Sequence, residues 1–159
     1  MNMSRVASNA ELGRVRQELR GATCWSARRG HGTFITLDLG ERQQHTTMTG
    51  GVVERGEYHL WLYMAKWQMV EESKSVDWNS ANAVVEQVLQ HCVGSFVTAI
   101  CGAPVTICMK GRSSTTFVLK RMEDADQYEP LFMLYMPQRR VLSANQDGVL
   151  RIGDDREVW

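Results

Sequence analysis

The residues of this chain best suited to bind a metal or to act as nucleophiles are its four histidines and four cysteines: His31, His45, His59, His91, Cys24, Cys92, Cys101 and Cys108. None of them follows the CxxC, HxxxH or HExxH spacings from which zinc sites are commonly built. Cys101 and Cys108 are separated by six residues and a turn with a proline, a wider gap than zinc pairs normally have. We therefore expect no metal site, and free, buried thiols of the kind found in a reducing cytosol.

Two further combinations have the residue types of a catalytic or phosphate site but lack its pattern. Cys24 and His59 are a nucleophile and a base, yet Cys24 stands beside Trp25 on an expected strand, where a buried thiol is the common outcome. Residues 110–116, KGRSSTT, lack the GxxxxGK[ST] order and join two expected strands, whereas a phosphate loop leads into a helix N-terminus. We predict a hairpin turn there, no catalytic residue and no cofactor.

The charge balance argues against a general nucleic-acid binder. Lys plus Arg and Asp plus Glu number 18 each, so the net charge is zero and the basic excess typical of that class is missing. An acidic segment, residues 123–129, lacks EF-hand spacing and is either a solvated loop or a partner contact. Together with the polar segment 40–56 it supplies the predicted partner-binding residues: Glu54, Arg55, Glu123, Asp124, Asp126, Tyr128 and Glu129.

The most aromatic stretch of the chain is HLWLYMAKW, residues 59–67. It falls within an expected strand over residues 57–70, neither face of which is polar over its first half, so both faces should be covered. Trp61, Tyr63 and Trp67 share one face at period two. We interpret this face as core beneath the protein's own helix; the alternative is a binding or dimer surface, where Trp and Tyr are over-represented.

The elements that would position these residues follow from periodicity and turn signals. Residues 10–20, with Asn9 as N-cap, have the apolar stripe of a first amphipathic helix. A second helix, capped by Ser75 or Asp77, has an apolar stripe from Ala81 to Cys92 and ends at Gly94. Residues 40–56 are polar and glycine-rich, and predict a long, mobile hairpin loop. The remaining expected strands are residues 23–27, 33–39, 95–101, 105–109, 115–121, 131–136, 141–142 and 149–152, the last two joined by an Asp147-Gly148 turn.

These elements predict an α+β fold, with an antiparallel curved sheet of about six to eight strands and two helices, in a single domain spanning residues 1–159. The helical stripes of the two halves match at a constant shift of 73 residues: Leu12, Val15, Leu19 and Gly21 match Val85, Val88, Cys92 and Gly94. An internal duplication of residues 9–76 and 77–152 is therefore one interpretation. Residues 1–17 lack the apolar core of a secretory signal, and no apolar run is long enough to span a membrane, so we expect a soluble, cytoplasmic protein.

Four segments carry a resemblance to a known group of proteins: GHGTFITLDLG at 30–40, GEYHLWLYMAKWQM at 56–69, HCVGSFVTAI at 91–100 and LFMLYMPQRRVL at 131–142. In this order they resemble a loose group of small, uncharacterised bacterial proteins that share a GEWHLWIYMC-type strand. The chain departs from that pattern at Ala65, where the group has Cys, and near Leu131 or Phe132, where it has Trp.

Proteins of this group often lie near polymorphic or contact-dependent toxin genes, so the resemblance implies an immunity protein. We accordingly expect a non-enzymatic protein that neutralises a cognate toxin by stoichiometric complex formation, without nucleic acid or membrane as a partner. Two alternatives stay open. One is a small-molecule-binding protein or enzyme with an aromatic pocket between sheet and helices. The other is a structural homodimer formed through the aromatic strand.

Overall fold

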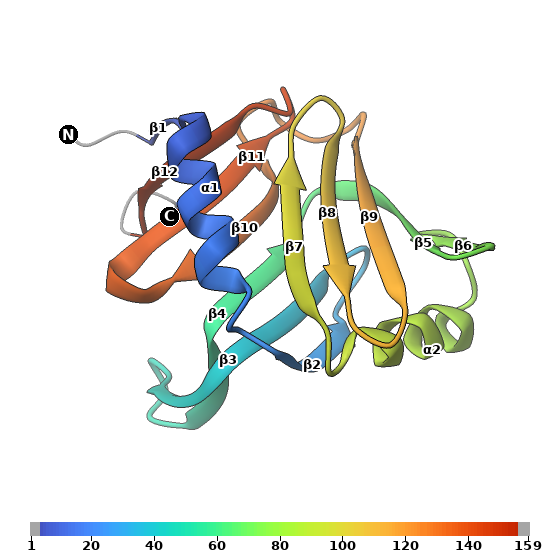
Figure 1. Ribbon diagram of the computed structural model, residues 1–159, viewed down its shortest axis with the longest axis horizontal. Coiled ribbons are helices and arrows are strands. Elements are labelled where there is room, and N and C mark those ends of the chain that lie inside the picture. Colours follow the sequence, from blue (N-terminus) through green and yellow to red (C-terminus); the bar gives the residue numbers. More distant parts are fainter. Residues whose placement is uncertain (1–3, 156–159) are drawn as a thin grey trace.

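The computed structural model describes residues 4–155, which form two helices and two antiparallel sheets of seven and five strands (Figure 1). The predicted α+β class, with antiparallel strands and two helices, is confirmed. The larger sheet contains, in spatial order, β1 (Arg5–Val6), β12 (Leu150–Asp154), β11 (Arg140–Asn145), β10 (Pro130–Met136), β4 (Val52–Leu62), β3 (Ile35–Thr46) and β2 (Cys24–Arg29). The smaller contains β6 (Lys74–Asp77), β5 (Ala65–Glu71), β9 (Ser114–Arg121), β8 (Val105–Lys110) and β7 (Phe96–Cys101).

A single apolar core holds the two sheets together. The larger sheet contributes a row of leucines from adjacent strands that are fully buried: Leu37, Leu60, Leu134 and Leu142. The smaller sheet contributes larger side chains, which are also fully buried: Trp67, Met69, Ile107 and Phe117. Each of these residues follows the alternation of its strand, because successive side chains of a strand point to opposite faces.

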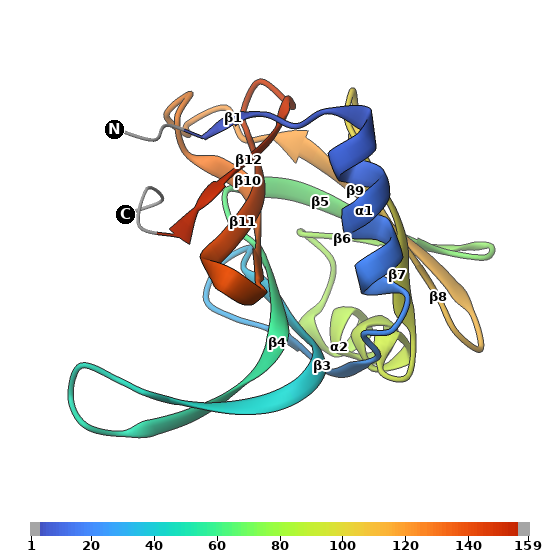
Figure 2. The ribbon, with the colours of Figure 1, turned by 60° about the vertical axis from the view of Figure 1, so that its left-hand side comes forward.

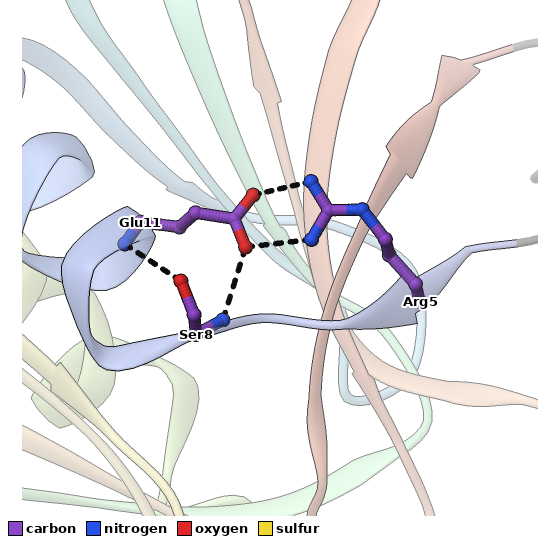
Figure 3. A network of polar contacts seen from close by, with 3 residues as sticks. All are labelled: Arg5, Ser8 and Glu11. Carbon is purple, nitrogen blue, oxygen red and sulfur yellow. Dashed lines mark hydrogen bonds and ion pairs between the residues drawn. The ribbon is translucent and has the colours of Figure 1, made fainter.

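The first helix, α1 (Asn9–Leu19), begins one residue earlier than the sequence predicts. Ser8, rather than the expected Asn9, is the N-cap: its hydroxyl accepts the Glu11 amide, while the Glu11 carboxylate accepts the Ser8 amide (Figure 3). Arg5 completes this capping box by donating both terminal nitrogens to the same carboxylate, and this contact lowers the pKa of Glu11 to about 2. The helix buries Val15 and Leu19 and packs against β7.

The second helix, α2 (Asn82–Cys92), buries the predicted stripe, including Val85, Leu89 and Cys92. Its N-cap is Ala81, which makes no side-chain hydrogen bond, so the predicted cap at Ser75 or Asp77 was wrong: both residues belong to β6. The helix packs against β2 and β6, so it links one edge strand of each sheet. None of the helices in the described part of the chain is long and apolar enough to cross a membrane.

The segment predicted as one strand over residues 57–70 is two strands in two different sheets. β4 ends at Leu62 and β5 begins at Ala65, with a bend between them where the amides of Tyr63 and Met64 donate to the carbonyls of Leu131 and Pro130. The bend shifts the alternation by one residue. β4 therefore buries its even-numbered residues, and β5 buries its odd-numbered ones.

The segment predicted as a long loop, residues 40–56, is mostly regular strand. β3 and β4 pair from Arg42 with Gly56 to Thr46 with Val52, and together they project from the body as a two-stranded ribbon (Figure 2). We call residues 41–55 the ribbon arm. In the described chain, the pairing of β3 with β2 and the pairing of β4 with β10 both stop at the base of the arm. Both outer edges of the arm therefore lack a neighbouring strand. The polar composition reflects exposure on both faces rather than the absence of strand.

Candidate functional site

A cleft of about 820 Å³ lies between the ribbon arm and the turn that joins β10 to β11. We call it the ribbon cleft. Its first wall is one face of the β3–β4 ribbon: Gln43, His45, Arg55, Glu57, His59 and Trp61. Its second wall is made by Tyr135, residues 136–139 and Asp155. A volume of this size falls in the range of small-molecule sites and of partner-binding grooves.

Strand alternation explains why these side chains gather. Arg55, Glu57, His59 and Trp61 are alternate residues of β4, so they point to the same side of the sheet. On the neighbouring strand, Gln43 lies directly opposite Arg55. The opposite wall turns sharply. Within it, Gln138 and Arg139 both adopt positive φ, at 64° and 60°, a conformation uncommon in residues other than glycine.

A buried carboxylate fixes the imidazole at the base of the cleft. Asp38 of β3 pairs with His59 of β4, and its Oδ1 lies 2.7 Å from Nδ1 of the ring. The same oxygen accepts the Gly56 amide at 2.9 Å. Burial raises the pKa of Asp38, but the hydrogen bonds from His59 and Gly56 outweigh it and leave the pKa below its ordinary value. An ionised Asp38 accepts the proton on Nδ1, so Nε2 is the imidazole nitrogen left for a ligand.

An aromatic cluster extends from the cleft along the same face of the sheet. The rings of Trp61 and Tyr63 meet edge to face at 5.0 Å, and Phe34 stacks on Tyr63 at 4.9 Å between centroids. Trp67 is not part of this cluster, because the bend after β4 places it in the core, where its Nε1 donates to the Thr33 carbonyl at 2.6 Å. The prediction that Trp61, Tyr63 and Trp67 share a face beneath a helix was therefore wrong, and they do not line one pocket.

The predicted partner-binding residues occupy two separate places. Glu54 and Arg55 lie on opposite faces of the ribbon arm: Arg55 lines the cleft, while Glu54 pairs with Arg42 at 3.2 Å on the other side. The acidic residues Glu123, Asp124, Asp126 and Glu129, with the exposed Tyr128, lie in the connection between β9 and β10. That connection is at the other end of the molecule from the arm in both views (Figures 1 and 2). The structure does not bring the two groups together.

Sequence reasoning missed the residues around Arg55 that complete the cleft. His59 was predicted neither to bind a metal nor to act with Cys24, and Asp38, Tyr135 and Arg139 were not predicted to line a site. The signal was present in β4, where Arg55, Glu57, His59 and Trp61 alternate with residues of a different face. The pairing with Asp38 depends on strand register, which one sequence does not reveal.

Cys24 and His59 lie on opposite faces of the larger sheet. Cys24 pairs with the buried Leu39, one residue along β3 from Asp38, and its thiol donates to the Ser26 carbonyl. Burial raises the pKa of Cys24 to about 12, so this thiol is not activated as a nucleophile. Among residues 4–155, no group of three or more His, Cys, Asp or Glu side chains is placed to hold a metal ion.

Comparison with known proteins leaves the site to be interpreted from its own geometry. No family model, no curated protein and no solved structure matches this chain.

Proposed function

We propose that this protein is an immunity-type binding protein that neutralises a cognate bacterial toxin by forming a stoichiometric complex. The observation that carries the proposal is the ribbon arm. A two-stranded hairpin that lacks further strands or a packed face is at best marginally stable in water. An arm of this length, held away from the core, is therefore best accounted for as an element that a partner protein covers.

The tip and the edges of the arm have the properties of a contact surface. Met48 is fully exposed, and Val52 and Val53 expose 63% and 38% of their surface. Along both edges of the arm the backbone pairs with no further strand of the described chain, so a partner strand can add there. Residues 41–55 contain neither proline nor lysine, two of the residues that most often block such pairing.

The cleft at the base of the arm adds side chains that commonly dominate binding energy. Trp, Tyr and Arg are the residue types most enriched at interface hot spots, and Arg55, Trp61 and Tyr135 all line this cleft. Because the net charge is zero, electrostatic recognition would come from such local groups rather than from the overall field. The resemblance of four segments to small bacterial proteins often found near toxin genes implies the same function.

The experiment is co-expression with the product of the neighbouring gene, followed by affinity purification and a growth-rescue assay. The wild-type chain is expected to co-purify at equal stoichiometry and to restore growth. In the test variant, residues 44–54 are replaced by Asn-Gly, which closes a short hairpin on the Gln43–Arg55 pair. This variant should fold, as judged by circular dichroism, but should lose both binding and rescue.

The matched control changes the other predicted surface. Glu123→Gln with Asp124→Asn neutralises two exposed carboxylates of the β9–β10 connection without touching the arm. The double variant should bind and rescue like the wild type. Absence of complex and rescue with the wild-type chain would overturn the proposed function, whereas full activity of the shortened arm would show that the contact lies elsewhere. Size-exclusion chromatography of the chain alone tests the homodimer alternative.

A further inference from the structure

The imidazole of His59 is held in one orientation by a carboxylate that the solvent barely reaches. Asp38 is 5% exposed, and its Oδ1 bonds both Nδ1 of His59 and the Gly56 amide. The His59 side chain is only slightly more exposed and lines the ribbon cleft. Because the imidazole is already fixed and its Nε2 is left for a ligand, binding there costs little side-chain conformational entropy.

Among the charged groups that face this cleft, the Arg55 guanidinium is the one without a partner in the described chain. The side chains of His45 and Arg55 have no hydrogen-bond or ion-pair partner among residues 4–155. By contrast, the Glu57 carboxylate accepts the Glu41 amide at 3.2 Å. On the opposite wall, Asp155 accepts Nε of Arg139 at 2.8 Å, so these two charges offset each other. Arg55 is therefore the cation of the cleft that no described carboxylate pairs with, while Glu57, on the same face of β4, keeps its negative charge.

An apolar surface adjoins these cationic groups. Trp61 follows His59 on the same face of β4, and Tyr135 lies directly opposite His59 on β10. Its ring centroid is 6.3 Å from that of His59. Aromatic walls beside one or two fixed polar groups are typical of sites for small organic ligands.

We propose that the ribbon cleft is a binding site for a small organic anion. The oxyanion, a phosphate or a carboxylate, lies between Nε2 of His59 and the Arg55 guanidinium, and the apolar body of the ligand packs against Trp61 and Tyr135. Charge-assisted hydrogen bonds from both groups hold the oxyanion, and the ionised Asp38 balances the imidazolium that donates to it. This assignment goes beyond toxin neutralisation and does not depend on it.

Four probes separate the contributions in the purified full-length chain: phenyl phosphate, benzoate, inorganic phosphate and benzyl alcohol. Binding is measured by isothermal titration calorimetry and by amide chemical-shift changes at pH 5.5. Phenyl phosphate, benzoate or both should bind at millimolar concentration and shift the amides of residues 55–61 and 135–139. Inorganic phosphate should bind more weakly than phenyl phosphate, and benzyl alcohol should bind more weakly still.

Charge-neutral variants locate the site. Arg55→Gln and His59→Gln should each raise the Kd by about tenfold or more, the loss expected for one charge-assisted hydrogen bond. Arg42→Gln is the matched control, because Arg42 lies on the same arm but on its other face, where it pairs with Glu54 and contacts the Trp25 ring. Its Kd should stay within about twofold of the wild type. If His59→Gln fails to fold, the exposed Arg55→Gln still decides the test.

The outcomes distinguish the source of the oxyanion. Binding of phenyl phosphate alone assigns a phosphate ligand, binding of benzoate alone a carboxylate, and binding of both a site selective only for charge. Failure of both probes, or equal weakening in Arg42→Gln and Arg55→Gln, would overturn the assignment. Equal affinity for inorganic phosphate and phenyl phosphate would show that the phenyl ring contributes nothing to binding, and would contradict the proposed packing against Trp61 and Tyr135. None of these results depends on a toxin, so they leave the proposed function to its own experiment.

Discussion

The Asp38 carboxylate and the His59 imidazole face each other across adjacent strands, with Oδ1 and Nδ1 2.7 Å apart. The same oxygen accepts a hydrogen bond from the Gly56 amide, beside the place where the β3–β4 register shifts between Leu39 and Arg42. One buried group therefore fixes two things at once. It orients the His59 ring at the base of the ribbon cleft, and it holds the backbone at Gly56, where the ribbon arm leaves the sheet.

Replacing Asp38 by Asn should lower the stability of the protein. The carboxylate accepts two hydrogen bonds while buried, and hydrogen bonds to a buried charged group contribute about 1.5–3 kcal/mol each. We expect Asp38→Asn to lower the free energy of unfolding by about 2 kcal/mol, as measured by urea denaturation at pH 7. The control is Glu54→Gln, which removes an exposed ion pair of the arm and should cost less than about 1 kcal/mol. Equal stability of the two variants would contradict the role of Asp38.

Lowering the pH should reduce the difference in unfolding free energy between the wild type and Asp38→Asn. The pKa of Asp38 is lower in the folded protein than its ordinary value of about 3.9, so the ionised carboxylate stabilises the folded state above that value. This stabilisation is lost as the pH falls through the folded-state pKa. The difference in urea midpoint between the wild type and Asp38→Asn, measured at pH 5, 4, 3 and 2.5, should therefore become smaller from pH 5 downward. A gap that widens over this range is the opposite sign and would refute the argument.

Gly56 is required by the close approach of two strands, and alanine there should be destabilising. An added Cβ would lie 2.5 Å from the backbone nitrogen and oxygen of Leu39 and 2.8 Å from the Tyr58 carbonyl oxygen. Backbone atoms cannot move aside as a flexible side chain can, so Gly56→Ala should cost about 2 kcal/mol or more. Gly13→Ala, within α1 and with nothing within 4 Å, should instead stabilise by about 0.5–1 kcal/mol. Thermal denaturation of the two variants should thus shift in opposite directions.

The four cysteines should differ sharply in reactivity. Cys24 and Cys92 are buried, and burial raises the pKa of each thiol to about 12, so their thiolate fraction at neutral pH is negligible. Cys101 is exposed and Cys108 half-buried. A native protein treated with a maleimide should label first at Cys101, as read by peptide mass spectrometry, and Cys101→Ser should remove that fast phase. Fast labelling of Cys24 in the native state would mean that β2 opens.

Local pattern was enough to predict the elements whose signal lies within a short segment. The apolar stripe from Ala81 to Cys92 predicted the second helix and its end, because burial on one helix face repeats at a fixed spacing, whereas the helix starts at Asn82, several residues after the predicted cap. The strand Val105–Lys110 and its partner Ser114–Arg121 were predicted in the same way, since the turn between them is polar. The predicted internal duplication is untested by these features and stays a prediction.

Features set by long-range pairing could not be predicted. The ribbon arm is polar on both faces, so its strands show no period-two signal and its composition is that of a loop. The contact of Asp38 with His59 joins residues 21 positions apart and depends on a register that a one-residue slip would destroy. The bend at Tyr63 and Met64 is held by the carbonyls of Leu131 and Pro130, which lie far along the chain.

Two tryptophans that the sequence placed on one face should now respond differently to truncation. Trp67 is 1% exposed, fills the core and donates its indole N–H to the Thr33 carbonyl, so Trp67→Ala should cost about 3–5 kcal/mol in urea denaturation. Trp61 is half-buried at the ribbon cleft and contacts Phe34 and Tyr63 edge-on, contacts worth about 0.5–1.5 kcal/mol each. Trp61→Ala should therefore cost clearly less, while weakening any ligand or partner held in the cleft. Equal losses would place both rings in one environment, which the one-residue shift at the bend between β4 and β5 forbids.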